Sequence, residues 1–130
     1  MKYRHENKRP CVDAYDRYSK ATAAVLDSDT GLLRITPEQY ADLQSLFFAV
    51  GGTTFELTAN AQIWPRALNS FINGTPDGIY LIVQDTGRPS GQGLDFVNGY
   101  TFLERFYSVF DTENRRVGLA TTSFTAATSN

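Results

Sequence analysis

A pair of glycines in the first half of the chain, Gly51-Gly52, constrains the fold more than any other feature of the sequence. The pair separates two short segments rich in apolar and β-branched residues, 46–50 and 53–58. A two-residue turn between antiparallel strands requires positive φ angles, which glycine adopts without steric cost. The pattern therefore predicts a β-hairpin, and a chain that contains it must build antiparallel sheet.

The rest of the chain favours short strands and few helices. Helices are expected from Asp13 to about Ala24, after Pro37, and for one turn around Phe102. Four further segments have the composition of strands: residues 32–36, 79–83, 106–111 and 117–120. Because strands follow one another across short turns without alternating helices, we expect a mainly β fold of antiparallel sheets with two or three short helices. Phe48 and Phe106 are expected in its core.

Length and composition indicate one domain. The chain has 130 residues, of which 42% are hydrophobic and 20% charged, so it can fill a core. Its net charge of −2 favours neither nucleic acid nor an anionic membrane as a partner. Neither a transmembrane segment nor a signal peptide is recognisable. Residues 1–12 are polar and basic, which predicts a poorly ordered arm before a domain at residues 13–130.

Few residues offer catalytic chemistry. The single cysteine, Cys11, excludes an internal disulfide, and the single histidine, His5, gives little support to a catalytic triad or a zinc site. We therefore expect no metal and no cofactor. Asp29-Thr30-Gly31 is of more interest, because two carboxylates on such loops can share a proton and activate water against a peptide bond. Asn73-Gly74-Thr75 is an acceptor triplet for N-glycosylation in a secretory pathway.

The last third of the chain carries a more specific pattern. An apolar segment ends at Gly99, the turn of helix around Phe102 follows, and after it come an alternating strand, a polar turn and a final strand that reads Val117-Gly118-Leu119-Ala120. This order closely resembles the end of pepsin-like aspartic peptidases, and the resemblance extends back to about residue 13. It implies a partial pepsin-like C-terminal lobe, most similar to the secreted basidiomycete members of that family.

The resemblance also sets the register of the Asp-Thr-Gly triplet. In the family the catalytic triplet follows a buried strand and precedes a hydroxyl residue, whereas Asp27 and Leu32 stand near those positions here. The helix expected at 13–24 resembles the one that follows the catalytic loop. The second-lobe catalytic aspartate would then precede that helix, yet residues 1–12 contain no aspartate. Asp29 is therefore expected to be a turn residue and not a catalyst.

The resemblance implies a lobe of an aspartic endopeptidase, an enzyme class that hydrolyses protein. Because the loop with the catalytic aspartate is missing, we expect the isolated chain to be inactive. The resemblance places Phe96 and Val97 in a substrate groove for a peptide or protein. Two alternatives stay open. One is a non-catalytic protein-binding or inhibitor module built on a pepsin-like lobe. The other is a homodimeric aspartic peptidase that uses Asp29 from each chain.

We expect a binding partner because the resemblance covers only part of the family's C-terminal lobe. Strands that complete the family lobe come before residue 13, and residues 1–12 are too charged to replace them. An open sheet edge and an uncovered apolar face, centred on Ile82, Phe96 and Val97, would favour self-association or a partner chain. The family is secreted, but this sequence does not indicate a compartment.

Overall fold

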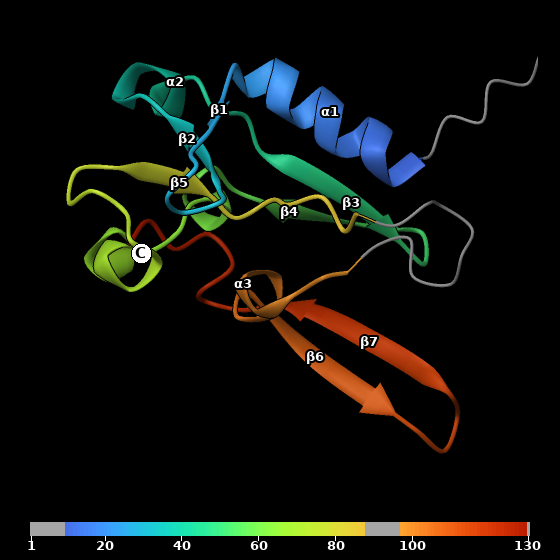
Figure 1. The fold of residues 1–130 in the computed structure, drawn as a ribbon. Helices are drawn as coiled ribbons and strands as arrows, with labels where there is room; N and C mark the ends of the chain where they lie inside the picture. The colour runs from blue at the N-terminus through green and yellow to red at the C-terminus, as the bar shows by residue number, and fades with distance from the viewer. Residues whose placement is uncertain (1–9, 88–96, 130) are drawn as a thin grey trace, which may run out of the picture.

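The computed structural model describes residues 10–87 and 97–129, with side-chain surroundings given from residue 14 onward. Three small antiparallel sheets and several short helices occupy these ranges (Figure 1). The expected fold class is therefore confirmed. One sheet has the strand order β1-β2-β5, and the others are the hairpins β3-β4 and β6-β7. Their bounds are β1 Val25–Leu26, β2 Leu33–Ile35, β3 Leu46–Val50, β4 Thr53–Leu57, β5 Ile79–Leu81, β6 Phe106–Asp111 and β7 Arg116–Thr121.

The hairpin predicted from Gly51-Gly52 is confirmed. Phe48 of β3 lies opposite Phe55 of β4, and Val50 lies opposite Thr53 at the turn. The two glycines have φ angles of 57° and 81°, the left-handed values that a two-residue turn requires. The second hairpin, β6-β7, extends away from the rest of the described chain (Figure 1).

The helices match expectation in part. Helix α1 (Pro10–Thr22) begins before the expected Asp13, because a proline is tolerated in the first turn, where its missing N–H would have no helical partner. Helix α2 (Pro37–Ala41) begins with a capping box, in which Thr36 and Gln39 each accept a backbone N–H of the other. Helix α3 (Tyr100–Leu103) is the expected turn. Two 3₁₀ helices, η1 (Asn60–Gln62) and η2 (Arg66–Ile72), complete the set.

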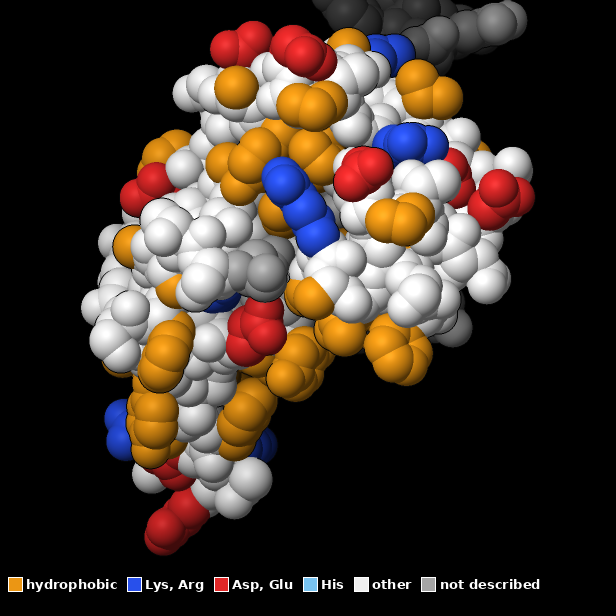
Figure 2. Space-filling model, turned by 90° about the vertical axis from the view of Figure 1, so that its left-hand side faces the viewer, with side chains coloured by type: hydrophobic (Ala, Val, Ile, Leu, Met, Phe, Trp, Pro, Cys, Tyr) orange, Lys and Arg blue, Asp and Glu red, His pale blue; other side chains and the backbone are white. Residues whose placement is uncertain are grey.

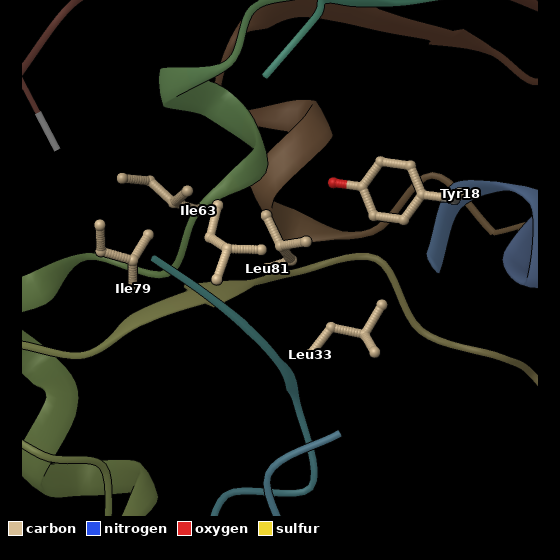
Figure 3. Packing of buried hydrophobic residues seen from close by; sticks show 6 residues of the cluster. Tyr18, Leu33, Ile63, Ile79 and Leu81 are labelled. Carbon is tan, nitrogen blue, oxygen red and sulfur yellow. The ribbon is translucent and has the colours of Figure 1, made fainter. Parts of the chain in front are cut away.

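Two clusters of buried side chains form the core. The first joins α1 to the three-stranded sheet, with Tyr18 directed toward Leu33 and Leu81 (Figure 3). The second gathers around Phe102 and Phe106, whose ring centroids lie 4.6 Å apart. Phe106 is buried as expected, whereas Phe48 is only half-buried and contacts the Phe102 ring edge-on.

Candidate functional site

Of the two Asp-Thr-Gly triplets in the sequence, Asp85-Thr86-Gly87 follows β5, whereas Asp29-Thr30-Gly31 lies in the turn between β1 and β2. Asp27 holds that turn together. The Asp27 Oδ1 atom accepts the backbone N–H of Asp29 at 3.1 Å and that of Thr30 at 2.9 Å. Gly31 has a φ of 71° and donates its N–H to the Asp27 carbonyl. The Thr30 hydroxyl accepts the N–H of Leu32. The Asp29 side chain is exposed, and the backbone N–H groups of the turn bind the Asp27 carboxylate instead.

The electrostatics of the turn also distinguish the two aspartates. The N–H of Thr30, with smaller contributions that include the N–H of Asp29 and the charge of Arg34, lowers the pKa of Asp27. An Arg34 nitrogen lies 3.9 Å from Asp27 Oδ2. Within the described chain, no hydrogen bond or ion pair joins the Asp29 carboxylate to another side chain. The geometry therefore provides a stable turn that is held by the Asp27 carboxylate.

A shallow, open depression of about 520 Å³ lies beside this turn. Its walls combine the exposed apolar side chains of Val25 and Leu26 with charged groups from Asp27, Arg34 and Asp77. Asp29 does not line it. The described residues contain no group of three or more His, Cys, Asp or Glu side chains that could hold a metal ion. This surface therefore lacks the converging polar groups that distinguish a catalytic pocket.

The residues assigned to a substrate groove are only partly described. Val97 is 56% exposed and directly precedes the loop into α3, whereas Phe96 lies outside the described residues. Tyr100, on the first turn of α3, is 81% exposed. An apolar surface is thus available next to Val97, and its role in binding a peptide stays a prediction.

The glycosylation triplet is also located, although its occupancy stays a prediction. Asn73 ends η2 in the left-handed region, with a φ of 58°, and is exposed. Its backbone N–H donates to the carbonyls of Asn69 and Ser70. No helix among the described residues is long and apolar enough to cross a membrane.

The largest feature that sequence reasoning missed is an apolar surface on the β6-β7 hairpin. Phe110 and Val117 face each other across the strands and are 66% and 62% exposed, while Tyr107 is 64% exposed. Figure 2 shows several separate groups of exposed hydrophobic side chains over the face in view. A half-buried strand normally alternates apolar and polar residues, and this segment was expected to do so. That expectation is wrong for residues 106–110, which place apolar side chains on both faces. That missing alternation was the available signal.

Comparisons with known proteins agree on one family. Residues 11–122 match the family described as eukaryotic aspartyl protease. Polyporopepsin from Irpex lacteus is 70% identical over 118 residues, which cover 91% of this chain and 35% of that protein. Gastricsin from Suncus murinus is 32% identical over 103 residues, 78% of this chain and 24% of the relative.

A solved structure supports the same relationship. The crystal structure of the aspartic proteinase from Irpex lacteus has a TM-score of 0.88 to this chain at 69% sequence identity, over 91% of this chain and 35% of that one. The chain therefore spans about a third, or less, of the length of these relatives.

Proposed function

The chain belongs to the eukaryotic aspartyl protease family, and from that premise we propose that it is part of a pepsin-like C-terminal lobe that hydrolyses no peptide by itself. The reaction of the family requires two carboxylates that share one proton and activate a water molecule. This chain contains two Asp-Thr-Gly triplets, Asp29-Thr30-Gly31 and Asp85-Thr86-Gly87, and both aspartates are exposed. The 130 residues serve as a scaffold and as one wall of the substrate groove. The two catalytic aspartates are not among them.

The observation that carries this proposal is the arrangement of hydrogen bonds in the turn. Its backbone N–H groups converge on Asp27, not on Asp29. A carboxylate that accepts such donors stays ionised and is held in place, whereas catalysis needs one that shares a proton with a partner. The Asp29 carboxylate is exposed and has no hydrogen-bond or ion-pair partner among the described residues.

An activity assay tests the proposal. The 130-residue chain is incubated with an unfolded protein at about pH 4, near the unperturbed pKa of aspartate, beside an intact pepsin-like peptidase as a positive control. We expect no turnover from this chain. Acid turnover that disappears in an Asp29→Asn variant would contradict the proposal and favour the homodimeric peptidase. Turnover that persists in that variant would contradict both.

Self-association or a partner chain is the second part of the proposal, and the β6-β7 hairpin supports it. A two-stranded hairpin without further packing is marginally stable in water. No other described strand pairs with β6 or β7, and their ten positions 106–110 and 117–121 carry no charged side chain that would discourage pairing at an edge. This is a different surface from the one expected around Ile82, which is half-buried.

Light scattering at micromolar concentration, with matched variants, tests this second part. Phe110→Lys adds a charge to the hairpin, and Phe71→Lys adds one to η2, where the side chain is also largely exposed. We expect the unmodified chain to associate, Phe110→Lys to reduce association, and Phe71→Lys to leave it unchanged. A clean monomer that binds no apolar dye, or an equal effect of both variants, would contradict the proposal.

The non-catalytic alternative makes a separate prediction with the same surface. A binding or inhibitor module would capture another protein tightly without cleaving it, and its affinity would fall in Phe110→Lys but not in Phe71→Lys.

The similarity to a protein of Irpex lacteus supports a fungal origin. Secretion remains part of the proposal, and recovery of the protein from culture medium rather than from cell extract would support it.

A further inference from the structure

Two Asn-Gly dipeptides, Asn73-Gly74 and Asn98-Gly99, occur in the described chain in different surroundings. An Asn-Gly sequence can modify itself, because the glycine backbone nitrogen can reach the side-chain amide carbon of the preceding asparagine. Glycine permits this approach since it has no Cβ and restricts the backbone least. The reaction needs a backbone nitrogen that is free to attack and a chain that can bend toward the side chain.

The structure restrains the first dipeptide. The Gly74 N–H donates to the Asn69 carbonyl at 2.8 Å, so its nitrogen is already engaged. The Asn69 side chain fixes the same loop through the carbonyls of Thr75 at 2.8 Å and Gly78 at 2.9 Å. Gly74 also lies against the fully buried Tyr80, since a Cβ placed on Gly74 would be 2.7 Å from a Tyr80 ring carbon. Bending here would break several hydrogen bonds at once.

The second dipeptide lacks these restraints. Asn98 and Gly99 lie outside helix and strand, and Gly99 is exposed. The Gly99 carbonyl accepts the N–H groups of Phe102 and Leu103, but no described residue accepts the Gly99 N–H or bonds the Asn98 amide. A Cβ placed on Gly99 would meet nothing within 4 Å. The attacking nitrogen therefore has no acceptor among the described residues, and there is room around it.

We propose that Asn98 is a site of spontaneous deamidation and that Asn73 is protected from it. A base removes the Gly99 amide proton, the nitrogen bonds to Asn98 Cγ, and the bond from Cγ to Nδ2 breaks. The Nδ2 atom takes up a proton and leaves as ammonia, and a cyclic imide remains. Water then opens the imide to aspartate or to isoaspartate. The net change exchanges ammonia for water and adds one negative charge beside Val97.

The two products differ in their effect on the core. The aspartate product keeps the original main chain. The isoaspartate product routes the main chain through the side chain and inserts one methylene group immediately before α3. That helix carries Phe102, which is buried between Phe48 and Phe106. Because closely packed interiors resist such displacement, the isoaspartate form unfolds more readily than the aspartate form.

Ageing the folded chain in warm, mildly alkaline buffer, followed by peptide mass spectrometry, tests the proposal. We expect the amide-to-acid mass change to accumulate at Asn98 at least several-fold faster than at Asn73. In denaturant the hydrogen bonds of Gly74 are lost, so the two rates should become similar. Equal rates in the folded chain, or faster reaction at Asn73, would overturn the proposal. If Asn98 still reacted faster than Asn73 in denaturant, the fold would not be the cause of the difference in rate.

A matched variant tests the cyclic route. Gly99→Ala adds a methyl group where there is space, and the Gly99 φ of −78° suits alanine. The variant should therefore fold, which circular dichroism checks, while its methyl group hinders ring closure. We expect deamidation at Asn98 to slow at least several-fold and that at Asn73 to be unchanged. An unchanged rate at Asn98 in the folded variant would exclude attack by this nitrogen.

Discussion

Tyr18 donates its phenolic hydrogen to Gln62 Oε1 across 3.0 Å, and this bond ties α1 to the centre of the molecule. Gln62 is fully buried, and its Nε2 donates to the carbonyls of Gln44 at 2.9 Å and Leu57 at 3.1 Å. One side chain thus joins α1, the segment before β3, and the end of β4. Burial raises the pKa of the Tyr18 phenol above its usual range, which keeps it protonated and able to donate.

Replacing Tyr18 by phenylalanine should therefore destabilise the fold although it removes only one atom. The buried Gln62 oxygen would lose its donor, and an unsatisfied buried group costs about 1–3 kcal/mol. Urea titration measures this change in the free energy of unfolding. Tyr15→Phe is the matched control on the same helix, because no hydrogen bond of the Tyr15 hydroxyl is found in the described chain. Equal losses in the two variants would contradict the role assigned to Gln62.

The two aspartates of the β1-β2 turn should respond differently to alanine. Asp29→Ala should change the free energy of unfolding by no more than about 0.5 kcal/mol, as exposed substitutions usually do. Asp27→Ala should cost more, because the backbone N–H groups of Asp29 and Thr30 lose their acceptor. Urea titration of both variants decides the order. A larger loss in Asp29→Ala would show that the triplet has a structural partner that this geometry lacks.

Stability should fall in acid through the same turn and through the tip of the β6-β7 hairpin. The Asn114 backbone N–H, then the Asn114 side chain and Arg116, lower the pKa of Asp111, and the Thr30 N–H chiefly lowers that of Asp27. A carboxylate whose pKa is lowered in the folded state stabilises the fold above its unfolded pKa of about 3.9. That contribution is lost as pH falls through the folded value.

Urea titrations across acid pH measure this loss. An Asp27→Asn, Asp111→Asn double variant should show a shallower decline below about pH 4 than the unmodified chain, because it has lost two groups that bind protons preferentially when unfolded. A decline of unchanged slope would assign the acid sensitivity to other carboxylates.

Burial separates three phenylalanines that look alike in the sequence. Phe106 is 4% exposed, and Phe106→Ala should cost about 3–5 kcal/mol. Phe48 is half-buried and should cost less, although the sequence suggested an equal place in the core. Phe110 is largely exposed in the isolated chain, so Phe110→Ala should stay within about 0.5 kcal/mol. Equal losses by urea titration would contradict the assignment of the second core cluster.

Local signals predicted the elements that depend on nearby residues. Gly51-Gly52 and the Thr36 cap act within a few positions, so the β3-β4 hairpin and α2 could be placed from the sequence. The 3₁₀ helix η2 was not predicted, because its support comes from Asn69, whose buried side chain binds carbonyls six to nine positions away. A buried polar residue such as Gln62 leaves no mark in a hydrophobic pattern, and hydrophobicity alone cannot show which apolar surface lacks a partner.

The last prediction concerns two glycines that differ only in what surrounds them. A Cβ on Gly78 would lie 2.4 Å from a ring carbon of Tyr80, which is fully buried and cannot turn aside. Gly78→Ala should therefore cost about 1–3 kcal/mol through overpacking. A Cβ on Gly118 would meet Val109 at 3.6 Å, an ordinary contact, so Gly118→Ala should change stability by less than about 0.5 kcal/mol. Equal losses of unfolding free energy in the two variants, measured by urea titration, would mean that the loop from Asn69 to Tyr80 can shift to accommodate a methyl group. The buried hydrogen bonds of Asn69 would then not be what fixes the loop.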